Sequence, residues 1–525
     1  MRLSRDLVNW FVAIAMGGSL ATYQMAPQWN AWWGLMDDSE FLGWAAPGRS
    51  LRASEYLTTL GRTEIGAIGT TTRFRPVYYM LRVGERVLWP SSPAWYYAVR
   101  TVMFGVALSL SAWALLVSLG RIVGIGVFAF VSMEWYWRDI WAHGGPAEQY
   151  AFIGVSMLAV AGAMAWTDRR VIRLRGIAVL ATAGTLLARG SKENFLILLI
   201  PFALVLRQLA RAPEHRRTLM ALFVFVTVCA VAIVAALLPG LRAAGADMYG
   251  HDIGAGSRLA WLSAGPGRWI AAAIVITALV LPAASWRVLP RARRTAEARV
   301  LHSELARRLH VHAGLLLLLV VSQLVFYIPK WPTFGGRYDF PGMLVYPLGF
   351  AVLTTYLLAW LSLANISPRD LRRVAIAAML VAVASASRHG MLPVRRAAEM
   401  NTLHTLALRV VLTTVVHQAN REGTKMPVIV EWQAGNEVEP ALSVMRLLRE
   451  LGNEGPFFLR PVAGAATPVP PAPLVRIGTT GISERGATAL PVAALRGALM
   501  ASGGEAMIVT LDGYAVPRVR QESEQ

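Results

Sequence analysis

Long apolar runs, separated by short polar and basic segments, fill the chain up to about residue 390. An apolar run of roughly 20 residues is long enough to cross the hydrocarbon core of a bilayer as a helix. The pattern predicts about 11 such helices, so the fold class is expected to be a polytopic α-helical membrane protein. The expected spans are 7–26, 94–119, 122–138, 150–167, 173–189, 193–210, 218–239, 268–286, 311–329, 341–364 and 372–388.

The first of these runs stands where a signal peptide would stand. It contains Trp10 and continues into Thr22 and Tyr23 without a small-residue cleavage site,. We therefore expect an uncleaved helix.

Composition and charge agree with a membrane protein. The chain is 55% hydrophobic and only 16% charged, with a mean hydropathy of +0.47, which is not the balance of a water-exposed surface. A net charge of +20 would otherwise suggest nucleic acid, but the arginines gather in short loops, where they anchor helix ends at anionic headgroups. The single cysteine, Cys229, lies in an apolar run, so an intrachain disulfide is excluded.

The arginine clusters fall on every second loop. By the positive-inside rule these loops and the N-terminus face the cytoplasm, so the expected topology is N-in and C-out. The chain would then be a multi-pass protein of a bacterial inner membrane with its other loops facing the periplasm. The clusters are Arg2 with Arg5, Arg121, 169–175, 207–217, 287–308 and 369–373.

The segment 391–525 has a different texture, with shorter apolar patches and more polar residues. It is expected to form a small α/β domain outside the cytoplasm, following a membrane domain over 1–390. A proline-rich stretch at 465–475 predicts a semi-rigid connector within it,. Its expected elements are an amphipathic stretch at 395–418, strands at 428–432 and 506–509, and a helix at 439–451,.

An acidic cluster, Asp37, Asp38 and Glu40, follows the first apolar run in a long loop over 27–93. A carboxylate near the hydrocarbon boundary has its charged form disfavoured unless a cation or metal accompanies it, which makes it a better base near neutral pH. Either aspartate is therefore a candidate general base. The same residues could instead cap a short re-entrant helix over 39–44.

Further polar clusters fall on the loops expected to face outward. Arginine forks bind phosphate oxygens in pairs, and a lysine at a helix N-terminus stands beside unpaired N–H groups that attract anions. The alternative roles are interfacial anchoring for the arginines and helix capping for Ser191 and Glu193. The candidate substrate- or phosphate-binding residues are Glu40, Arg73, Arg75, Lys192, Glu193, Lys330, Arg337 and Tyr338.

The cytoplasmic loops contain no glycine-rich phosphate-binding motif,. An enzyme whose acids and bases lie outside the cytoplasm has no access to nucleotide sugars, so an activated donor would have to be linked to a lipid. The nine histidines show no metal-ligand spacing,.

Together these motifs resemble the GT-C superfamily of integral membrane glycosyltransferases, with the greatest likeness to its protein O-mannosyltransferase-like and TMTC-like branch. The resemblance covers roughly 1–390. It rests on the acidic pair after the first span, Arg73-Phe74-Arg75-Pro76, Ser191-Lys192-Glu193 before a middle span, Arg337-Tyr338 ahead of Pro341, and a soluble outward tail.

The resemblance implies an inverting hexosyl- or pentosyltransferase that uses a polyprenyl-phosphate-linked sugar and acts on the outer face. One of Asp37 or Asp38 would be the general base, and Arg75, Lys192 and Arg337 would hold the leaving phosphate,. Glu193 would orient Lys192 or the sugar. Some members of the superfamily bind Mg²⁺ or Mn²⁺ at the acidic loop, and the candidate ligands here are Asp38 and Glu40.

The expected partners are the lipid-linked donor, membrane lipids and an acceptor that is a glycan, a lipid or a protein, with no nucleic acid. The tetratricopeptide repeats that TMTC-like proteins carry are absent, so lipid A or an envelope polysaccharide is as good an acceptor as a protein.

Two other functions are consistent with the same composition. A flippase or transporter of lipid-linked glycans would place charges at mid-membrane and show symmetric halves, and neither is clear in the sequence. An O-antigen ligase or polymerase would depend on arginine and histidine in a large outer loop, and the paired aspartates argue against it. A structural scaffold would not gather titratable groups on one face.

Overall fold

The computed structural model describes part of the chain, and all structural statements below concern that part. The described residues are 5–35, 37–68, 73–89, 91–134, 136–167, 174–210, 215–244, 337, 340, 342–344, 367–421, 425–433, 439–453, 455–462, 500–511 and 517–523. The expected spans at 268–286 and 311–329, nearly all of the one at 341–364, and the connector at 465–475 lie outside them.

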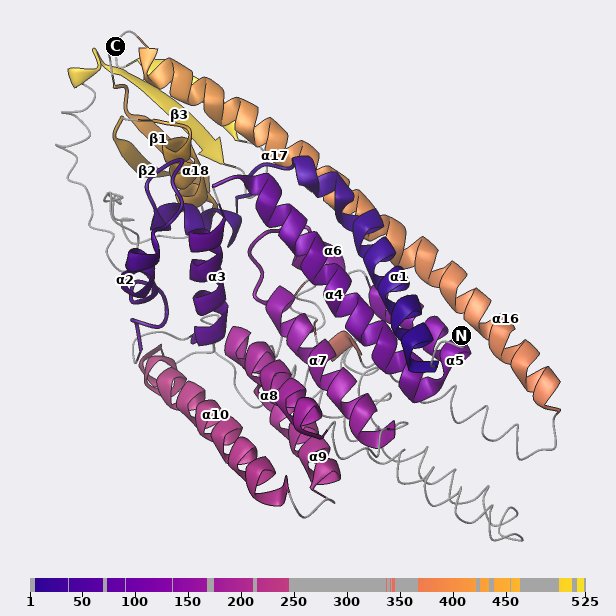
Figure 1. Cartoon of the computed structure of the whole chain (residues 1–525). Helices are drawn as coiled ribbons and strands as arrows, with labels where there is room; N and C mark the ends of the chain where they lie inside the picture. Colours follow the sequence, from indigo (N-terminus) through magenta and orange to yellow (C-terminus); the bar gives the residue numbers. More distant parts are fainter. Residues whose placement is uncertain are drawn as a thin grey trace, which may run out of the picture.

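The described chain is mostly helical, and its centre is a bundle. In it α1 (Arg5–Met25) packs along α4 (Pro93–Leu119), α4 against α7 (Glu148–Thr167), and α7 against α8 (Leu174–Ser191). Figure 1 shows these helices side by side, with α9 (Leu199–Leu209) and α10 (Arg216–Ala244) at their edge. Their shared core is apolar and aromatic. Close side-chain packing is what associates helices in a bilayer, because lipid tails are themselves apolar.

Membrane-crossing candidates coincide with four of the predicted spans. Within the described residues four helices are long and apolar enough to cross a bilayer. The predicted total of about 11 spans and the N-in, C-out orientation stay predictions. The four helices are Pro93–Leu119, Glu148–Trp166, Arg216–Gly240 and Arg372–Ala419.

Two predicted spans have a different form. The run expected at 122–138 is split into α5 (Arg121–Ser132) and the short α6 (Trp137–Trp141). At 1.5 Å per residue the 12-residue α5 reaches only about 18 Å, which is short of the roughly 30 Å hydrocarbon core. The span expected at 193–210 begins instead as a 3₁₀ helix, η5 (Glu193–Leu198), before α9.

The first long loop is built of short helices, not open coil. They are η1 (Ala26–Asn30), η2 (Asp37–Trp44), η3 (Ala53–Glu55), α2 (Tyr56–Leu60) and α3 (Pro76–Leu88). Proline at the first position of α3 has no N–H to leave unpaired and has the right φ for a helix start,. The alternative in which the acidic residues cap a helix over 39–44 takes a different form, because η2 begins at Asp37 and includes both aspartates.

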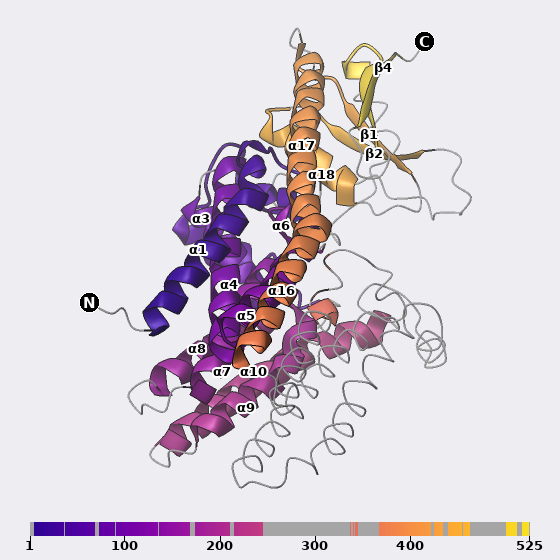
Figure 2. The ribbon, with the colours of Figure 1, turned by 90° about the vertical axis from the view of Figure 1, so that its right-hand side faces the viewer.

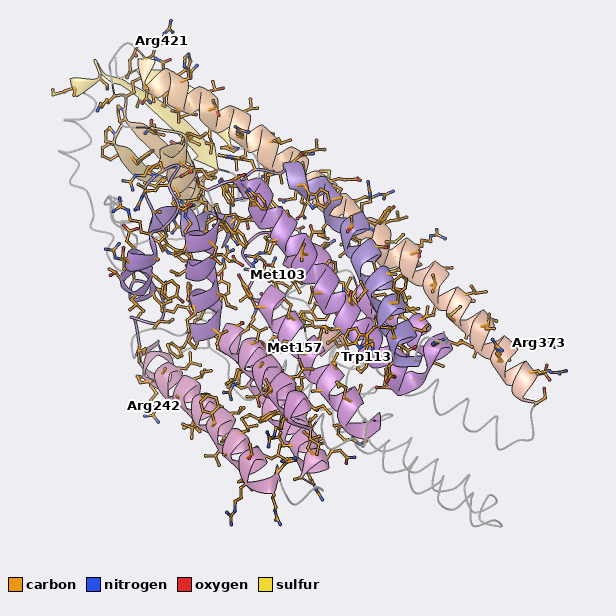
Figure 3. All side chains as sticks on the ribbon, in the orientation of Figure 1. Met103, Trp113, Met157, Arg242, Arg373 and Arg421 are labelled. Carbon is orange, nitrogen blue, oxygen red and sulfur yellow. The ribbon has the colours of Figure 1, made fainter. Side chains whose placement is uncertain are left out.

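A long helix connects the bundle to the C-terminal part of the chain. It consists of α16 (Pro368–Ala386), a π-helical turn η11 (Ser387–Met391) and α17 (Leu392–Ala419). The boundary predicted at 390/391 falls in the π-helical turn, where the carbonyl of Met133 leaves no room for a Cβ on Gly390. In Figure 3, Arg373 and Arg421 mark the two ends of this helix.

The C-terminal part contains a four-stranded sheet in the order β2-β1-β3-β4. β1 (Val428–Gln433) is parallel to both β2 (Phe457–Val462) and β3 (Glu505–Leu511), and β4 (Arg518–Ser523) is antiparallel to β3. With α18 (Glu439–Glu450) between β1 and β2, this agrees with the expected α/β unit.

The sheet and the first loop share a hydrophobic core. Val428 and Val430 of β1 and Val444 of α18 are buried in the same cluster as Trp33 and Phe41 of the loop. Figure 2 shows the sheet, α17 and α18 together at one end of the molecule. The fold therefore holds the acidic segment of the loop between the bundle and the C-terminal sheet.

Candidate functional site

Asp38 is completely buried and both of its oxygens are engaged. Its Oδ2 accepts a hydrogen bond from the Tyr97 hydroxyl at 2.7 Å, and its Oδ1 accepts one from the Gly144 N–H at 2.6 Å. Gly34 packs directly on the carboxylate, because a Cβ there would lie 3.0 Å from Oδ2. Asp38 thus fastens η2 to the bundle.

Gly144 lies in a loop over 142–147, between α6 and α7, and both of its backbone polar groups are used. Its N–H donates to Asp38, and its carbonyl oxygen accepts from Arg82 Nη1 and Arg100 Nε, each at 2.9 Å. The next carbonyl, that of Gly145, accepts from the Tyr78 hydroxyl at 2.8 Å. The 142–147 loop is therefore the junction between the acidic segment, α3 and α4.

The arginines on Gly144 belong to a buried group that we call the Glu85 cluster: Glu85, Arg82, Arg100 and Tyr150. Arg100 binds Glu85 through both terminal nitrogens, at 2.6 and 2.5 Å. The Tyr150 hydroxyl and Arg82 also donate to this carboxylate, at 2.5 and 3.3 Å. Burial alone would raise the pKa of Glu85, but the charge of Arg100 and these hydrogen bonds hold it below its ordinary value,.

Glu40 and Arg75, two predicted site residues, are joined through Tyr79. The Tyr79 hydroxyl donates to Glu40 Oε1 at 3.1 Å, and Arg75 Nη2 lies 3.4 Å from the same hydroxyl. Burial and the charge of Glu40 raise the pKa of Tyr79 well above its ordinary value, so it stays a hydrogen-bond donor. Arg75 also binds Glu64 through Nη2 at 2.5 Å and Nε at 3.2 Å.

Burial alone would lower the pKa of Arg75, but the carboxylate of Glu64, with a smaller effect from Glu193, raises it well above its ordinary value. The backbone also links the two loops, because the N–H of Phe74 donates to Glu193 Oε1 at 3.0 Å. The predicted pair of motifs, one at 73–76 and one at 191–193, therefore meets in the structure.

The second half of the site is a group that we call the Lys192 cluster: Lys192, Glu148, Glu193 and Arg337. Lys192 Nζ donates to Glu148 Oε1, and both side chains are buried. The charge of Arg337 acts on the same carboxylate. Lys192 therefore binds Glu148 directly, and Arg337, from a distant segment, acts on it through its charge.

Near Arg337 in the sequence, Phe340 is packed into the bundle. The ring of Phe340 is fully buried among Tyr136, Trp137 and Phe195. Its carbonyl accepts from Asn194 Nδ2 at 3.4 Å. The aromatic anchor thus positions the arginine three residues earlier.

The structure corrects the local role predicted for Ser191. It does not cap a helix at its start, because it is the last residue of α8 and Lys192 follows in an extended conformation with φ −153°. The helix continues through Ser191 since Lys192 N–H still bonds to the Ala188 carbonyl, at 3.1 Å. Lys192 therefore stands at a break between α8 and η5.

Of the other predicted site residues, Arg73 is half-buried just before Phe74. The backbone of Asp37 lies in η2, and its side chain is outside the described part. Lys330 and Tyr338 lie outside the described residues.

Several residues that form the site were missed in the sequence. Glu148, Glu64 and Glu85 are each bound to a predicted or newly found cation, and Gly144 joins the parts. One signal was present: His143-Gly144-Gly145-Pro146 precedes an acidic residue at the start of an apolar run. Glu85 gave no signal, because its position in an amphipathic segment is typical of a solvated face.

The residues present do not fit the metal site expected at Asp38 and Glu40. Both Asp38 oxygens accept from protein donors, and Glu40 accepts from Tyr79. Among the described side chains no group of three or more His, Cys, Asp or Glu is placed to hold a metal ion. We derive no step through a metal.

Fold and site together define a helical chain with membrane-length helices and a buried set of paired acids and bases at the junction of its first loop, the 142–147 loop and the α8–η5 break. No family model and no curated protein matches the chain. Two solved structures are similar to it, those of ArnT from Cupriavidus metallidurans in the apo state and bound to undecaprenyl phosphate.

The two likenesses are distant in sequence. Identity is 14% for both, the TM-scores are 0.44 and 0.42, and the matched regions cover 96% and 95% of this chain and 93% of each neighbour. We therefore base the functional proposal on the residues of this chain alone.

Proposed function

We propose that this protein is a membrane glycosyltransferase that moves a sugar from a polyprenyl-phosphate carrier to an acceptor on the extracytoplasmic face, with inversion at the anomeric carbon. One observation carries the proposal. Arg75, Lys192 and Arg337, which lie far apart in the sequence, are gathered with Glu193 and Glu148 at the ends of apolar helices. A phosphate attached to a membrane lipid would arrive at such a place.

The Lys192 cluster has the chemistry to receive that phosphate. Glu148 binds Lys192, and the charge of Arg337 acts on the same carboxylate, so the cluster brings two cationic side chains from distant segments to one place. Cations held in place in a site sheltered from water stabilise the charge that develops on a leaving phosphate. Glu148 would hold Lys192 in position before the donor binds.

In the reaction, the acceptor hydroxyl oxygen forms a bond to the anomeric carbon while the bond from that carbon to the phosphate oxygen breaks. The electron pair of the broken bond leaves with polyprenyl phosphate, and the hydroxyl proton passes to a general base. We assign the base to Asp37. Asp38 already holds two donors and is fully buried, so its proposed role is to position η2.

The test measures donor turnover by the full chain in lipid nanodiscs, followed as release of polyprenyl phosphate from polyprenyl-phospho-mannose and polyprenyl-phospho-glucose with an envelope lipid extract as acceptor. Asp37→Asn is expected to lower turnover by about 10²- to 10⁴-fold, the usual contribution of a general base. The matched control is Asp139→Asn, at a side chain that is 40% exposed and pairs with Arg138, and it should leave turnover unchanged.

A second variant separates phosphate binding from folding. Removing Lys192 alone would leave the buried Glu148 without its partner, so Lys192→Gln is combined with Glu148→Gln. The double variant is expected to bind undecaprenyl phosphate about tenfold more weakly or worse, measured by native mass spectrometry. Wild-type affinity in this variant together with wild-type turnover in Asp37→Asn and Asp38→Asn would refute the proposed function.

A further inference from the structure

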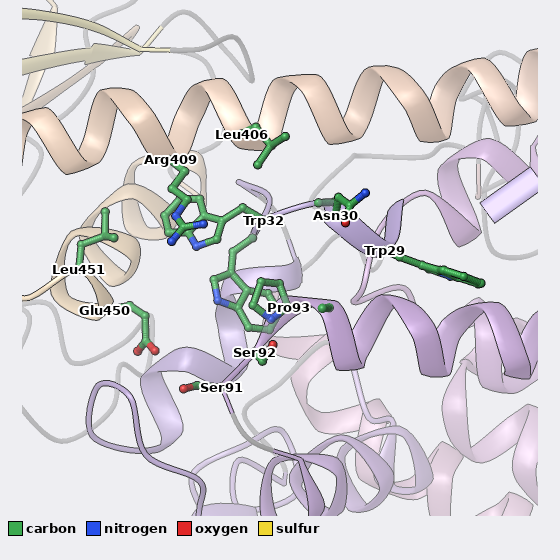
Figure 4. A pocket seen from close by; sticks show the side chains of 13 residues that line it. Trp29, Asn30, Trp32, Ser91, Ser92, Pro93, Leu406, Arg409, Glu450 and Leu451 are labelled. Atoms are coloured by element: carbon green, nitrogen blue, oxygen red, sulfur yellow. The ribbon is translucent and has the colours of Figure 1, made fainter. Parts of the chain in front are cut away.

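A pocket of about 500 Å³ lies away from the charged clusters, between the first loop, the start of α4, α17 and α18. In Figure 4, Leu406 and Arg409 of α17 lie above, and Trp32 lies near the centre close to Arg409. Trp29 lies on the right, and Glu450 with Leu451, at the end of α18, lies on the left. Its size is in the range of small-molecule binding sites.

The lining residues combine aromatic faces with hydrogen-bonding edges. Trp29, which is 43% exposed, supplies the open aromatic surface, whereas Trp32 and Trp33 also line the pocket but are buried. Asn30, Ser91 and Ser92 supply polar groups around it. A sugar ring has this same division, with apolar C–H faces and a rim of hydroxyls that both donate and accept, so the pocket matches a saccharide in both respects.

The charges of the lining favour a sugar over a lipid headgroup. The two charged lining side chains, Arg409 and Glu450, have opposite signs, so there is no surplus of lining cations of the kind that binds a phosphate. The Glu450 carboxylate also accepts a hydrogen bond from the Gly48 N–H at 3.1 Å. The charge of the buried Arg86 acts on the same carboxylate.

The pocket is connected to the acidic segment through its own wall. The Tyr97 hydroxyl that donates to Asp38 lies 3.3 Å from the carbonyl oxygen of Trp32. On the other side, Trp32 N–H donates to Thr405 Oγ1 of α17 at 3.0 Å. A ligand against Trp32 would therefore lie next to the chain segment that carries Asp37.

We infer that this pocket binds a saccharide of the acceptor, stacked on the exposed Trp29 and hydrogen-bonded by Arg409 and Glu450; this inference rests on the proposed glycosyl transfer. The acceptor would then be a glycan or glycolipid, and the C-terminal sheet, through α17 and α18, would complete the acceptor site.

The experiment measures saccharide binding with no donor present. Saturation-transfer-difference NMR is recorded on chitobiose, mannobiose and lactose with the full chain in nanodiscs. We expect saturation on ring C–H protons for at least one of the three. Trp29→Ala and Arg409→Ala should weaken its binding about tenfold, Trp29→Phe should retain it, and the controls Leu403→Ala and Arg396→Ala, on α17 away from the pocket lining, should leave it unchanged,.

Three outcomes would overturn the inference: no binding of any of the three sugars, binding that the pocket variants leave unchanged, or occupation of the pocket by dihexanoylphosphatidylglycerol in place of sugar. The Lys192→Gln/Glu148→Gln variant should keep saccharide binding, because those residues lie outside the pocket. In the wild-type chain, saccharide binding without any donor turnover would count against the proposed glycosyl transfer, and donor turnover without saccharide binding would count against the pocket.

Discussion

The Glu85 cluster and the Lys192 cluster are both buried and both meet the 142–147 loop, but their charges are arranged differently. In the first, one carboxylate receives hydrogen bonds from Arg82, Arg100 and Tyr150, and both arginines also bind the Gly144 carbonyl. In the second, Glu148 binds Lys192, and the charge of Arg337, from a distant segment, acts on the same carboxylate.

This difference indicates that one cluster stabilises the fold and that the other binds a ligand. The acceptor positions of the Glu85 carboxylate are filled by hydrogen bonds, and both arginines that donate to it also donate to the Gly144 carbonyl. Such a carboxylate is not available to a ligand, and it joins α3, α4 and α7. The second cluster brings a lysine and an arginine from distant segments together, and such cations are the groups that bind phosphate oxygens. The Glu85 cluster would stabilise the fold around the site, and the Lys192 cluster would bind the phosphate of the donor.

The largest expected effect comes from breaking the Glu85 cluster. Glu85→Ala would leave Arg82 and Arg100 buried without their carboxylate, a loss of about 3–5 kcal/mol in the free energy of unfolding. Denaturant unfolding in detergent micelles measures it. The matched control, Glu55→Ala, removes an acid that pairs with Arg49 at the surface and should change stability little. Equal effects from both would show that the cluster does not hold the fold.

A smaller loss is expected from Asp38, which reaches the same cluster through Gly144. Asp38→Asn would turn an amide group toward the Tyr97 hydroxyl or the Gly144 N–H, at a cost of about 1–3 kcal/mol in the free energy of unfolding. Asp37→Asn should unfold like the wild type while losing turnover. If Asp38→Asn instead keeps full stability and loses turnover, then Asp38 is the base and the roles are reversed.

The smallest effect is a pH dependence at the pocket. Burial raises the pKa of Glu450, so the folded chain binds this proton more tightly than the unfolded chain. The contribution to stability is present below the ordinary pKa of glutamate and is lost as pH rises through the raised folded value. Glu450→Gln should flatten this decline in denaturant midpoints taken from about pH 4 to about pH 8. The Glu85 cluster predicts the opposite sign, since its low pKa makes stability fall as pH falls.

The apolar pattern predicted helices well where a run stands alone. The runs at 94–119 and 218–239 became α4 and α10, because hydropathy depends on local composition. It failed at 122–138, where α5 ends at Ser132 before Glu134 and a second helix follows. The average composition of this 17-residue run is apolar and hides the single acidic residue, Glu134, that lies between the two helices.

For the site, sequence patterns identified residues with distinctive side chains and missed those defined by their partners. Arg75, Lys192, Glu193 and Arg337 were predicted, and the structure brings them near one another. Gly144 was not, because its role depends on backbone groups that every residue has. Glu85 and Glu148 were not predicted either. Each is bound by a cation from a distant part of the sequence, and that pairing is visible only in the folded chain.

The continuous helix from α16 to α17 has a consequence for the height of the C-terminal sheet. The stretch Arg372–Ala419 contains 48 residues, which at 1.5 Å each extend about 72 Å, more than twice the roughly 30 Å of a hydrocarbon core. A continuous helix that crosses a bilayer and extends this far beyond it would fix the distance between the lipid surface and the sheet that follows.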